Sequence, residues 1–376
     1  MRLPSAAILT LYLDNFSYHM PTKVVYGQNS LKDIDAYINH RKTLLITSRG
    51  FVTRGLIDEV NTYTNNIVEV ISNIKSHPEF VDIEKIYNQA HQNQFELIVA
   101  IGGGSVMDTA KFVAVHNNKG YQFVENLTKG KMESKDYKVI PIISIPTTAG
   151  TGSEVSPYST IWDMQSKQKY SLNLPDLFCE VAIYDPVLTL SVPKQITIQT
   201  GLDTLSHALE SIWNKNANHI TVSYAVKSAK LVMGNLVELS NDLKNLEYRS
   251  NIMKACMYAG FAFSNTQTAI AHAMSYYITT HKNIDHGIAC SFTLPMLIDN
   301  VIGQYDFIDI ALKEIFGELS SNKLRRFLKE LEVSTVFQDY GIDNSEFKKI
   351  LISLENSQRA DNSLVEINPL KKYQKH

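Results

Sequence analysis

Near-continuous runs of apolar residues in the first half of the chain constrain its fold most strongly. They alternate with segments of helical periodicity, for example 81–92 and 107–116. Apolar runs of this kind are typical of strands that are covered on both faces, and strand–helix alternation predicts an α/β domain with a parallel sheet. The predicted strands are 42–47, 66–72, 96–101, 138–145 and 181–184.

The strand signals stop after about Pro193, and only helical periodicity follows. A chain of 376 residues exceeds one typical domain, so we predict an α/β domain over 1–192 and an all-helical domain over 193–376. The predicted helices of the second domain are 194–214, 221–239, 248–263, 268–280, 292–302, 306–316, 321–331 and 345–354.

Composition excludes several classes of protein. The formal net charge is -2 with scattered Lys and Arg, so we expect neither nucleic acid nor a membrane as a partner. Three cysteines without a CxxC spacing indicate a reducing, cytoplasmic location without disulfides. The apolar run 6–13 is interpreted as a disordered lead-in or an extra strand rather than a secretory signal. The polar segment 360–376 is predicted to be a frayed tail.

A glycine-rich turn joins the strand at 96–101 to the following helix. Gly102, Gly103 and Gly104 allow the backbone to approach a phosphate, and the helix N-terminus offers N–H donors to an anion. Ser105 and Asp108 form an S-x-x-D pattern, which predicts a capped helix start. Taken alone, the turn is equally compatible with an ordinary tight connection.

A second loop of small polar residues follows the next predicted strand. The segment 146–154 (PTTAGTGSE) lies at the carboxyl end of strand 138–145, where open α/β sheets bind ligands. An ordinary surface loop is the alternative, but two such loops at two strand ends favour a dinucleotide site. We therefore assign dinucleotide binding to the domain 1–192.

Four residues of the helical half are candidate metal ligands. Asp203 and His207 are four residues apart, so a helix places them on one face, and His272 and His286 follow. One carboxylate and three imidazoles suit Fe²⁺ or Zn²⁺. The alternatives are a surface pair for Asp203 with His207 and hydrogen-bonded core positions for the other histidines.

Together these motifs resemble the iron-dependent (group III) alcohol dehydrogenases. The similar segments are GGGSVMDTAK (102–111), PTTAGTGSE (146–154), GLDTLSHALE (201–210), HAMSY (272–276) and HGIAC (286–290). The resemblance implies a nucleotide-binding α/β domain, a helical metal-binding and catalytic domain, and an active site between them. It also implies reversible, NAD(P)-linked reduction of an aldehyde to a primary alcohol, with the metal acting as a Lewis acid.

The same resemblance assigns individual residues. The metal ligands are Asp203, His207, His272 and His286. The cofactor-binding residues are Ser48, Gly103, Gly104, Ser105, Asp108, Thr147, Thr148, Ser153 and Lys169. Many members carry a proton-relay histidine four residues after the third ligand, where this chain has Tyr276, so Tyr276 and His281 are the relay candidates.

The cofactor prediction depends on the end of the first predicted strand. NAD-preferring members often place an aspartate there, whereas this chain has Ser48 and Arg49. No carboxylate repels a 2′-phosphate at this point, and Arg49 is able to bind one. We predict acceptance of NADP(H), with NAD(H) as the alternative.

The segments 160–172 and 272–295 resemble the phosphonoacetaldehyde reductase branch, which forms 2-hydroxyethylphosphonate. This resemblance implies a small, anionic aldehyde substrate, for which Arg249 and Lys282 are the nearest cations in sequence to the site motifs. That branch carries a basic residue within 265–268, where this chain has Gln267.

Three other functions are alternatives to the reduction of a small anionic aldehyde. They are a general short- or medium-chain alcohol dehydrogenase, a dehydroquinate-synthase-like lyase that regenerates its NAD, and a protein that only binds nucleotide. The segments 201–208 and 272–276 favour the dehydrogenase. We expect a homodimer.

Overall fold

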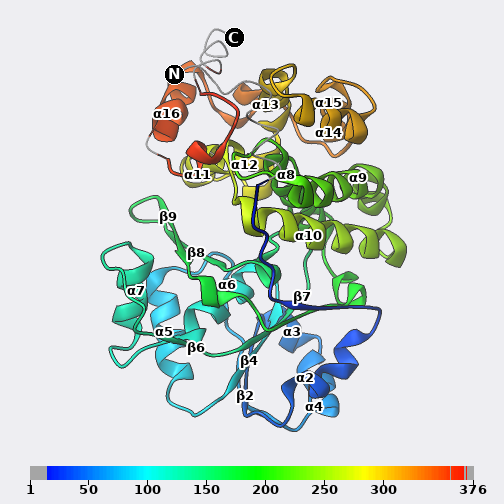
Figure 1. Ribbon diagram of the computed structural model, residues 1–376. Coiled ribbons are helices and arrows are strands. Elements are labelled where there is room, and N and C mark those ends of the chain that lie inside the picture. Colours follow the sequence, from blue (N-terminus) through cyan, green and yellow to red (C-terminus); the bar gives the residue numbers. More distant parts are fainter. Residues whose placement is uncertain (1–14, 356, 368–369, 371–376) are drawn as a thin grey trace. The chain divides into compact units, whose positions relative to one another are not determined.

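The computed structural model describes residues 15–355, 357–367 and 370 and divides the chain into two compact units (Figure 1). Residues 20–192 form one unit. The residues from Pro193 onward form the other, together with the described residues before Met20.

A six-stranded parallel sheet organises the unit 20–192, as predicted for an α/β domain. Its strand order is β1-β10-β7-β4-β2-β3, and all five pairings are parallel. The strands are β1 (Lys23–Tyr26), β2 (Thr43–Thr47), β3 (Ile67–Ile71), β4 (Leu97–Gly102), β7 (Ile142–Pro146) and β10 (Val181–Tyr184).

Helices cover both faces of this sheet, which explains the continuous apolar runs. Leu44 and Ile46 of β2 point to one face, and Leu45 between them points to the other. The first face packs against α5 (Phe80–Ala90), α6 (Gly104–Ala114) and α7 (Tyr121–Thr128). The second packs against α2 (Ile34–Ile38), α3 (Arg49–Thr53) and α4 (Leu56–Tyr63).

The predicted strand over 138–145 is wrong in its extent, because two strands occupy it. β6 (Lys138–Val139) pairs antiparallel with β5 (Val115–His116), and β7 begins only after Pro141. Proline has no N–H to continue a ladder, so the chain changes partners there. The β8–β9 hairpin (Tyr158–Asp163 and Gln168–Asn173) is a further element that the apolar pattern does not predict.

The order of the strands locates the ligand-binding edge of the sheet. From β2 the chain moves outward to β3, and from β4 it moves in the opposite direction to β7 and β10. The crevice at the carboxyl ends of β2 and β4 is therefore the topological switch point, where open α/β sheets bind their ligands. Ser48 follows β2, and Gly103 follows β4.

The second unit is helical among its described residues, as predicted. Its longest helices, α8, α9 and α10, pack against one another. The helices are α8 (Lys194–Ile212), α9 (His219–Asn241), α10 (Leu246–Thr266), α11 (Ile270–Lys282), α12 (His286–Ser291), α13 (Leu294–Val301), α14 (Asp306–Phe316), α15 (Asn322–Glu330) and α16 (Asn344–Glu355). The short α12 is too brief to show periodicity, so the sequence does not predict it.

The segments near both chain ends belong to the helical unit. Tyr18 donates through its hydroxyl to the Phe261 carbonyl at 3.1 Å, so residues 15–19 do not belong with the α/β domain to which 1–192 is assigned. The apolar run 6–13 lies outside the described residues.

The prediction of a frayed tail is wrong for residues 360–367. Ser363 forms an antiparallel bridge with Asn214, and the Leu364 N–H donates to the Trp213 carbonyl at 2.9 Å. This segment is docked because backbone pairing and the burial of Val365 stabilise it.

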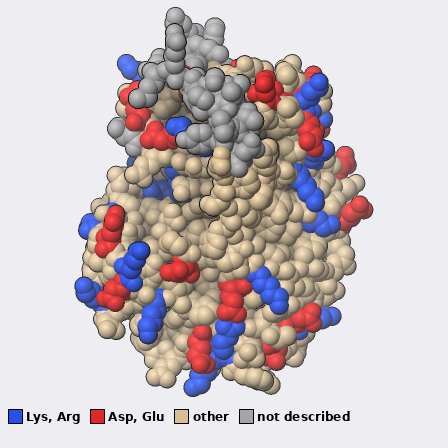
Figure 2. All heavy atoms as spheres, in the orientation of Figure 1, with Lys and Arg blue, Asp and Glu red and all other residues tan. Residues whose placement is uncertain are grey.

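Charges of both signs intermingle on the face shown in Figure 2, outside its grey region. Among the described residues, no helix is both long enough and apolar enough to cross a bilayer.

Candidate metal centre and nucleotide-binding loops

The helix α8 carries the first polar residues of the candidate metal centre. Asp203, His207 and Glu210 follow one another at spacings of four and three residues, so they share one helix face. All three side chains are buried, although α8 is otherwise rich in apolar and small residues. A buried face with this much charge requires partners, and helices α11 and α12 supply them.

The structure brings the four predicted ligands together. Asp203 Oδ1 lies 3.4 Å from His272 Nε2, 3.9 Å from His207 Nδ1 and 4.0 Å from His286 Nε2. The His207 ring also stacks on that of His272 with 4.4 Å between centroids. One ligand atom each from Asp203, His272, His286 and Cys290 lies within 4.8 Å of the others. This set contains Cys290, which the family motifs do not assign as a ligand, and it does not contain His207.

The imidazoles keep the Asp203 carboxylate ionised. Burial alone raises the pKa of Asp203, but His207, His272 and His286 outweigh it and hold this pKa well below its usual range. Burial likewise lowers the pKa of His272, but Cys290 and Glu210 raise it well above its ordinary value. The centre therefore holds an ionised carboxylate among buried imidazole nitrogens.

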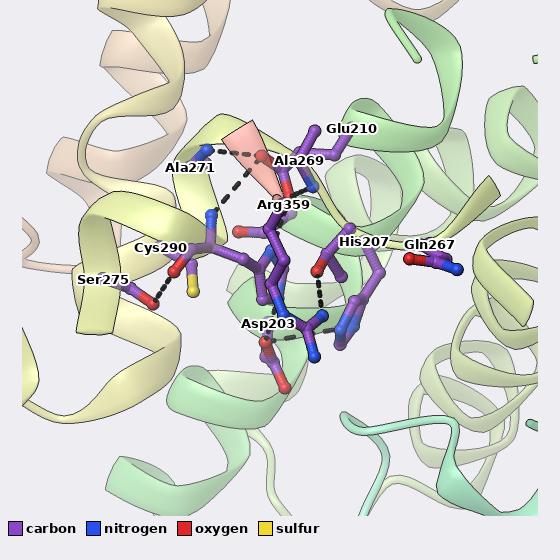
Figure 3. A network of polar contacts seen from close by, with 12 residues as sticks. Asp203, His207, Glu210, Gln267, Ala269, Ala271, Ser275, Cys290 and Arg359 are labelled. Carbon is purple, nitrogen blue, oxygen red and sulfur yellow. Dashed lines mark hydrogen bonds and ion pairs between the residues drawn. The ribbon is translucent and has the colours of Figure 1, made fainter. Parts of the chain in front are cut away.

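Glu210, which Figure 3 shows beside Ala269 and Ala271, fixes the orientation of His272. Its carboxylate accepts from His272 Nδ1 at 2.6 Å, so the Nε2 atom faces Asp203. It also accepts from the backbone N–H groups of Ala269, Ala271 and His272 at the start of α11. Glu210 is thus the carboxylate partner that metal-binding histidines generally have. The signal for it is present in the sequence, seven residues after Asp203 on the same helix face.

Close packing places His286 against α8. A Cβ atom on Gly287 would come within 2.0 Å of the Gln199 carbonyl oxygen, so only glycine permits this contact. Ser275 Oγ lies 3.3 Å from His286 Nδ1, and Cys290 Sγ lies 3.8 Å from the same ring. Burial raises the pKa of the Cys290 thiol.

These residues fit a divalent metal. Asp203 Oδ1 and His272 Nε2 are buried and make no hydrogen bond among the described residues. Such atoms are costly unless another group engages them. A donor set of one carboxylate and imidazoles suits Fe²⁺ or Zn²⁺, and the nearby thiol is compatible with Zn²⁺.

The two relay candidates lie in different surroundings. Tyr276 is half-buried, and its ring is nearly parallel to that of His286, with 6.3 Å between centroids. His281 is exposed in the last turn of α11, stacks on Tyr277 and contacts the Tyr277 carbonyl through Nδ1. The structure therefore brings Tyr276, but not His281, to the metal centre.

The cations proposed from sequence for an anionic substrate are engaged elsewhere. Arg249 is 4% exposed and donates to Thr197 Oγ1 and to the Leu243 carbonyl. Lys282 forms a 3.0 Å ion pair with Glu346. Both residues stabilise contacts between helices.

In the other unit, the two predicted cofactor loops touch each other. The Thr147 N–H donates to the Gly102 carbonyl at 2.9 Å. A Cβ atom on Gly103 would lie 3.1 Å from Thr148 Oγ1, and one on Gly104 only 2.5 Å from Thr151. A side chain at position 104 would therefore force the loops apart at the carboxyl ends of β4 and β7, and one at position 103 would be tight. Ser105 is half-buried in the first turn of α6.

Two charged residues of α6 hold the second loop in place. The fully buried Lys111 donates to the carbonyls of Ser153, Ser156 and Tyr158. Asp108 accepts from Ser153 Oγ at 2.9 Å and from the hydroxyl of Thr160 at 2.8 Å.

The S-x-x-D cap predicted for α6 is wrong. The N-cap residue is Gly103, without a side-chain hydrogen bond, because the Asp108 side chain is engaged by the loop instead.

The remaining cofactor candidates are Ser48 and Lys169. Ser48 is the N-cap of α3 directly after β2, and the neighbouring Arg49 is exposed. Lys169 lies on β9, where its Nζ is 5.0 Å from the Trp162 ring centroid.

Comparison with known proteins is consistent with this architecture. Residues 21–186 match the family model described as iron-containing alcohol dehydrogenase, and residues 197–363 match the model for the C-terminal part of that family. A 1,3-propanediol dehydrogenase of Klebsiella pneumoniae is 30% identical over 322 residues, covering 81% of this chain and 80% of the relative. An alcohol dehydrogenase of Thermococcus barophilus is 31% identical and covers 83% of each chain.

Among solved structures, the sulfoacetaldehyde reductase of Bifidobacterium kashiwanohense in complex with NAD+ superposes with a TM-score of 0.87. It is 27% identical and covers 96% of this chain and 98% of that chain.

The chain belongs to the iron-containing alcohol dehydrogenase family and is an oxidoreductase. The resemblance drawn from its motifs is confirmed at the level of the family.

Proposed function

We propose that this protein reduces a small aldehyde to a primary alcohol with NAD(P)H, at a divalent metal held by Asp203, His207, His272 and His286. The observation that carries the proposal is the convergence of these side chains around Asp203 Oδ1, a buried atom without a hydrogen bond among the described residues. The metal would be Fe²⁺ or Zn²⁺.

When bound, the metal would polarise the carbonyl as a Lewis acid and the reduced nicotinamide would supply the hydride. The protein's own residues orient the proposed ligands and supply a proton carrier for this chemistry. Glu210 holds His272 in the tautomer that leaves Nε2 available, and Ser275 contacts the other side of His286. Tyr276 is the proposed proton carrier, because its half-buried ring lies beside His286.

The nucleotide is proposed to bind at the switch point between β2 and β4. Gly103, Gly104 and Ser105 would receive the pyrophosphate at the start of α6, and Thr147 and Thr148 would supply further donors. Asp108 and Ser153 would position the second loop through their mutual hydrogen bond.

NADP(H) is proposed as an accepted cofactor. Ser48 and the exposed Arg49 follow β2, where a carboxylate would otherwise repel the 2′-phosphate. The Bifidobacterium kashiwanohense neighbour was solved with NAD+, so NAD(H) is the competing cofactor.

The proposed substrate is a small anionic aldehyde such as phosphonoacetaldehyde, with 2-hydroxyethylphosphonate as its product. The solved neighbour named as a sulfoacetaldehyde reductase supports an anionic group close to the aldehyde. The relatives named as 1,3-propanediol dehydrogenases support the competing reading, a dehydrogenase of short neutral alcohols.

The proposal includes the division of the chain into a nucleotide-binding domain, 20–192, and a metal-binding domain, 193–376, with residues 15–19 belonging to the latter. It also includes a cytoplasmic homodimer.

A panel of aldehydes and alcohols tests the proposal after reconstitution with Fe²⁺ or Zn²⁺, with NADPH and NADH in parallel. We expect aldehyde-dependent oxidation of NADPH, fastest with phosphonoacetaldehyde or sulfoacetaldehyde. A protein that consumes no reduced cofactor with any aldehyde contradicts it. Turnover of a sugar-phosphate acid without net change in NAD absorbance would favour the lyase.

A further inference from the structure

The segment 357–363 brings a cation, Arg359, beside the ring of Tyr276. The segment is docked by its backbone, since the Lys215 N–H donates to the Asn362 carbonyl at 2.8 Å. Asn362 Nδ2 also donates to the Thr268 carbonyl at 3.1 Å. These bonds place the segment beside the turn between α10 and α11.

Arg359 projects from this segment toward the candidate ligands. Its guanidinium donates to Thr268 Oγ1 at 2.7 Å and lies 5.7 Å from the centroid of the Tyr276 ring. Tyr276 in turn lies beside His286. Figure 3 shows the Arg359 side chain running toward Asp203 and His207.

We infer that Arg359 is a specificity-determining residue that binds the anionic group of the substrate, with the Thr268 hydroxyl beside it. The inference rests on the proposed function and deepens it by naming the substrate class. That class is short aldehydes carrying a sulfonate or phosphonate on the carbon next to the carbonyl.

The chemistry of the guanidinium supports this assignment. Arginine presents five N–H donors in a planar fork that matches a tetrahedral oxyanion with two parallel bonds. A guanidinium beside Tyr276 would suit a substrate that carries an anionic group at the end away from its aldehyde. The cation is also partly removed from water, since Arg359 is half-buried, and this strengthens its attraction for an anion.

A purely structural role for Arg359 is the competing explanation. Asn362 already ties the segment to residue 268 through the backbone carbonyl, and Ser363 pairs with Asn214. The hydrogen bond from Arg359 to the Thr268 hydroxyl is therefore not needed to hold the segment in place. Loss of Arg359 is therefore expected to change substrate choice more than folding.

Gln267 fits the same interpretation. It occupies the segment where a basic residue is expected from the resemblance, and its backbone has a φ of 63°. Its side chain accepts from Asn362 Nδ2 at 3.5 Å rather than presenting a charge. Arg359, bound to the next residue in the chain, supplies the charge at this place.

The test compares Arg359→Gln and Arg359→Lys with wild type on four aldehydes: sulfoacetaldehyde, phosphonoacetaldehyde, acetaldehyde and propanal. We expect Arg359→Gln to lower kcat/KM for the anionic aldehydes by about 100-fold, mainly through KM, because two charged hydrogen bonds are lost. For the neutral aldehydes kcat/KM should stay within about threefold. Arg359→Lys should restore part of the loss. Arg326→Gln, an exposed arginine, is the matched control.

A binding measurement separates this inference from the proposed function. Ethanesulfonate and methylphosphonate carry the anion without an aldehyde, and calorimetric titration should detect binding of at least one to wild type but not to Arg359→Gln. The anion that binds more tightly identifies the preferred group. Unfolding midpoints verify that both variants are folded, and Arg359→Lys carries the test if Arg359→Gln is not.

Two results overturn the inference while aldehyde reduction stands: equal kcat/KM of wild type on anionic and neutral aldehydes, or an unchanged preference in Arg359→Gln. A wild-type enzyme that reduces no aldehyde but still binds ethanesulfonate through Arg359 would refute the proposed function instead.

Discussion

Substitution of Glu210 by glutamine probes the part of the metal centre that motif comparison overlooks. Glu210 is fully buried, and its two oxygens accept from four N–H groups: His272 Nδ1 and the backbone of Ala269, Ala271 and His272. Glutamine has nearly the same shape but only one oxygen. Its amide nitrogen would face two N–H donors that then have no acceptor.

Each buried donor without an acceptor costs about 1–3 kcal/mol, so the loss of acceptors for two donors in Glu210→Gln should lower the free energy of unfolding by about 2–6 kcal/mol. Loss of the carboxylate that orients His272 should also weaken metal binding by about 10–100-fold. Denaturant unfolding of the metal-free protein measures the first effect, and competition with a chelator for Zn²⁺ measures the second. Glu314→Gln, which breaks only an exposed ion pair with Lys230, should change stability by less than about 0.5 kcal/mol.

The reasoning about Glu210 is refuted if Glu210→Gln unfolds at the same denaturant concentration as wild type and retains its Zn²⁺ affinity. A loss of stability with unchanged affinity would leave Glu210 as a helix-stabilising residue and remove its role in orienting His272.

Three further substitutions test other contacts. Gly287→Ala should destabilise the protein by about 3 kcal/mol and weaken metal binding, because the new methyl meets the Gln199 carbonyl; thermal unfolding and metal content measure this. Lys111→Met should remove the hydrogen bonds from Lys111 to three loop carbonyls, lower stability by about 3 kcal/mol and raise KM for the cofactor through displacement of the loop at Ser153. Arg49→Ser should lower kcat/KM for NADPH about tenfold and leave that for NADH unchanged, as steady-state kinetics would show.

Each of these substitutions has a matched control or a contradicting result. A Cβ atom on Gly234, within α9, meets no neighbouring atom, so Gly234→Ala should be neutral or stabilising by up to about 1 kcal/mol. The exposed Lys230→Met should leave the cofactor KM unchanged. Equal loss of NADH and NADPH activity in Arg49→Ser would show that Arg49 does not bind the 2′-phosphate.

The sequence predicts the α/β unit well because its strands are buried on both faces. The apolar runs of β2, β4 and β10 can therefore be recognised directly, because polar residues do not alternate with the apolar ones. The edge strand β1 and the hairpin β8–β9 are not predicted, since mixed polar and apolar residues occupy them. Only their pairing with other strands identifies them.

The candidate site is predictable to the extent that it depends on helical spacing and family motifs. Asp203 and His207 come from an i, i+4 pair, whereas Glu210 and Cys290 come close to His272 only through the packing of α8, α11 and α12. Arg359 is the clearest example, because it lies directly before a segment predicted to be a frayed tail. Contacts between residues about ninety positions apart, such as Arg359 with Thr268, leave no local pattern in a sequence.

Titration of the metal-free protein with Fe²⁺ or Zn²⁺ tests the central claim most directly, with bound metal and aldehyde-dependent NADPH oxidation measured on the same samples. We predict one tightly bound ion per chain, activity that rises in proportion to occupancy, and loss of both in Asp203→Asn. Full activity in protein from which metal has been removed, or wild-type metal content in Asp203→Asn, would contradict the claim.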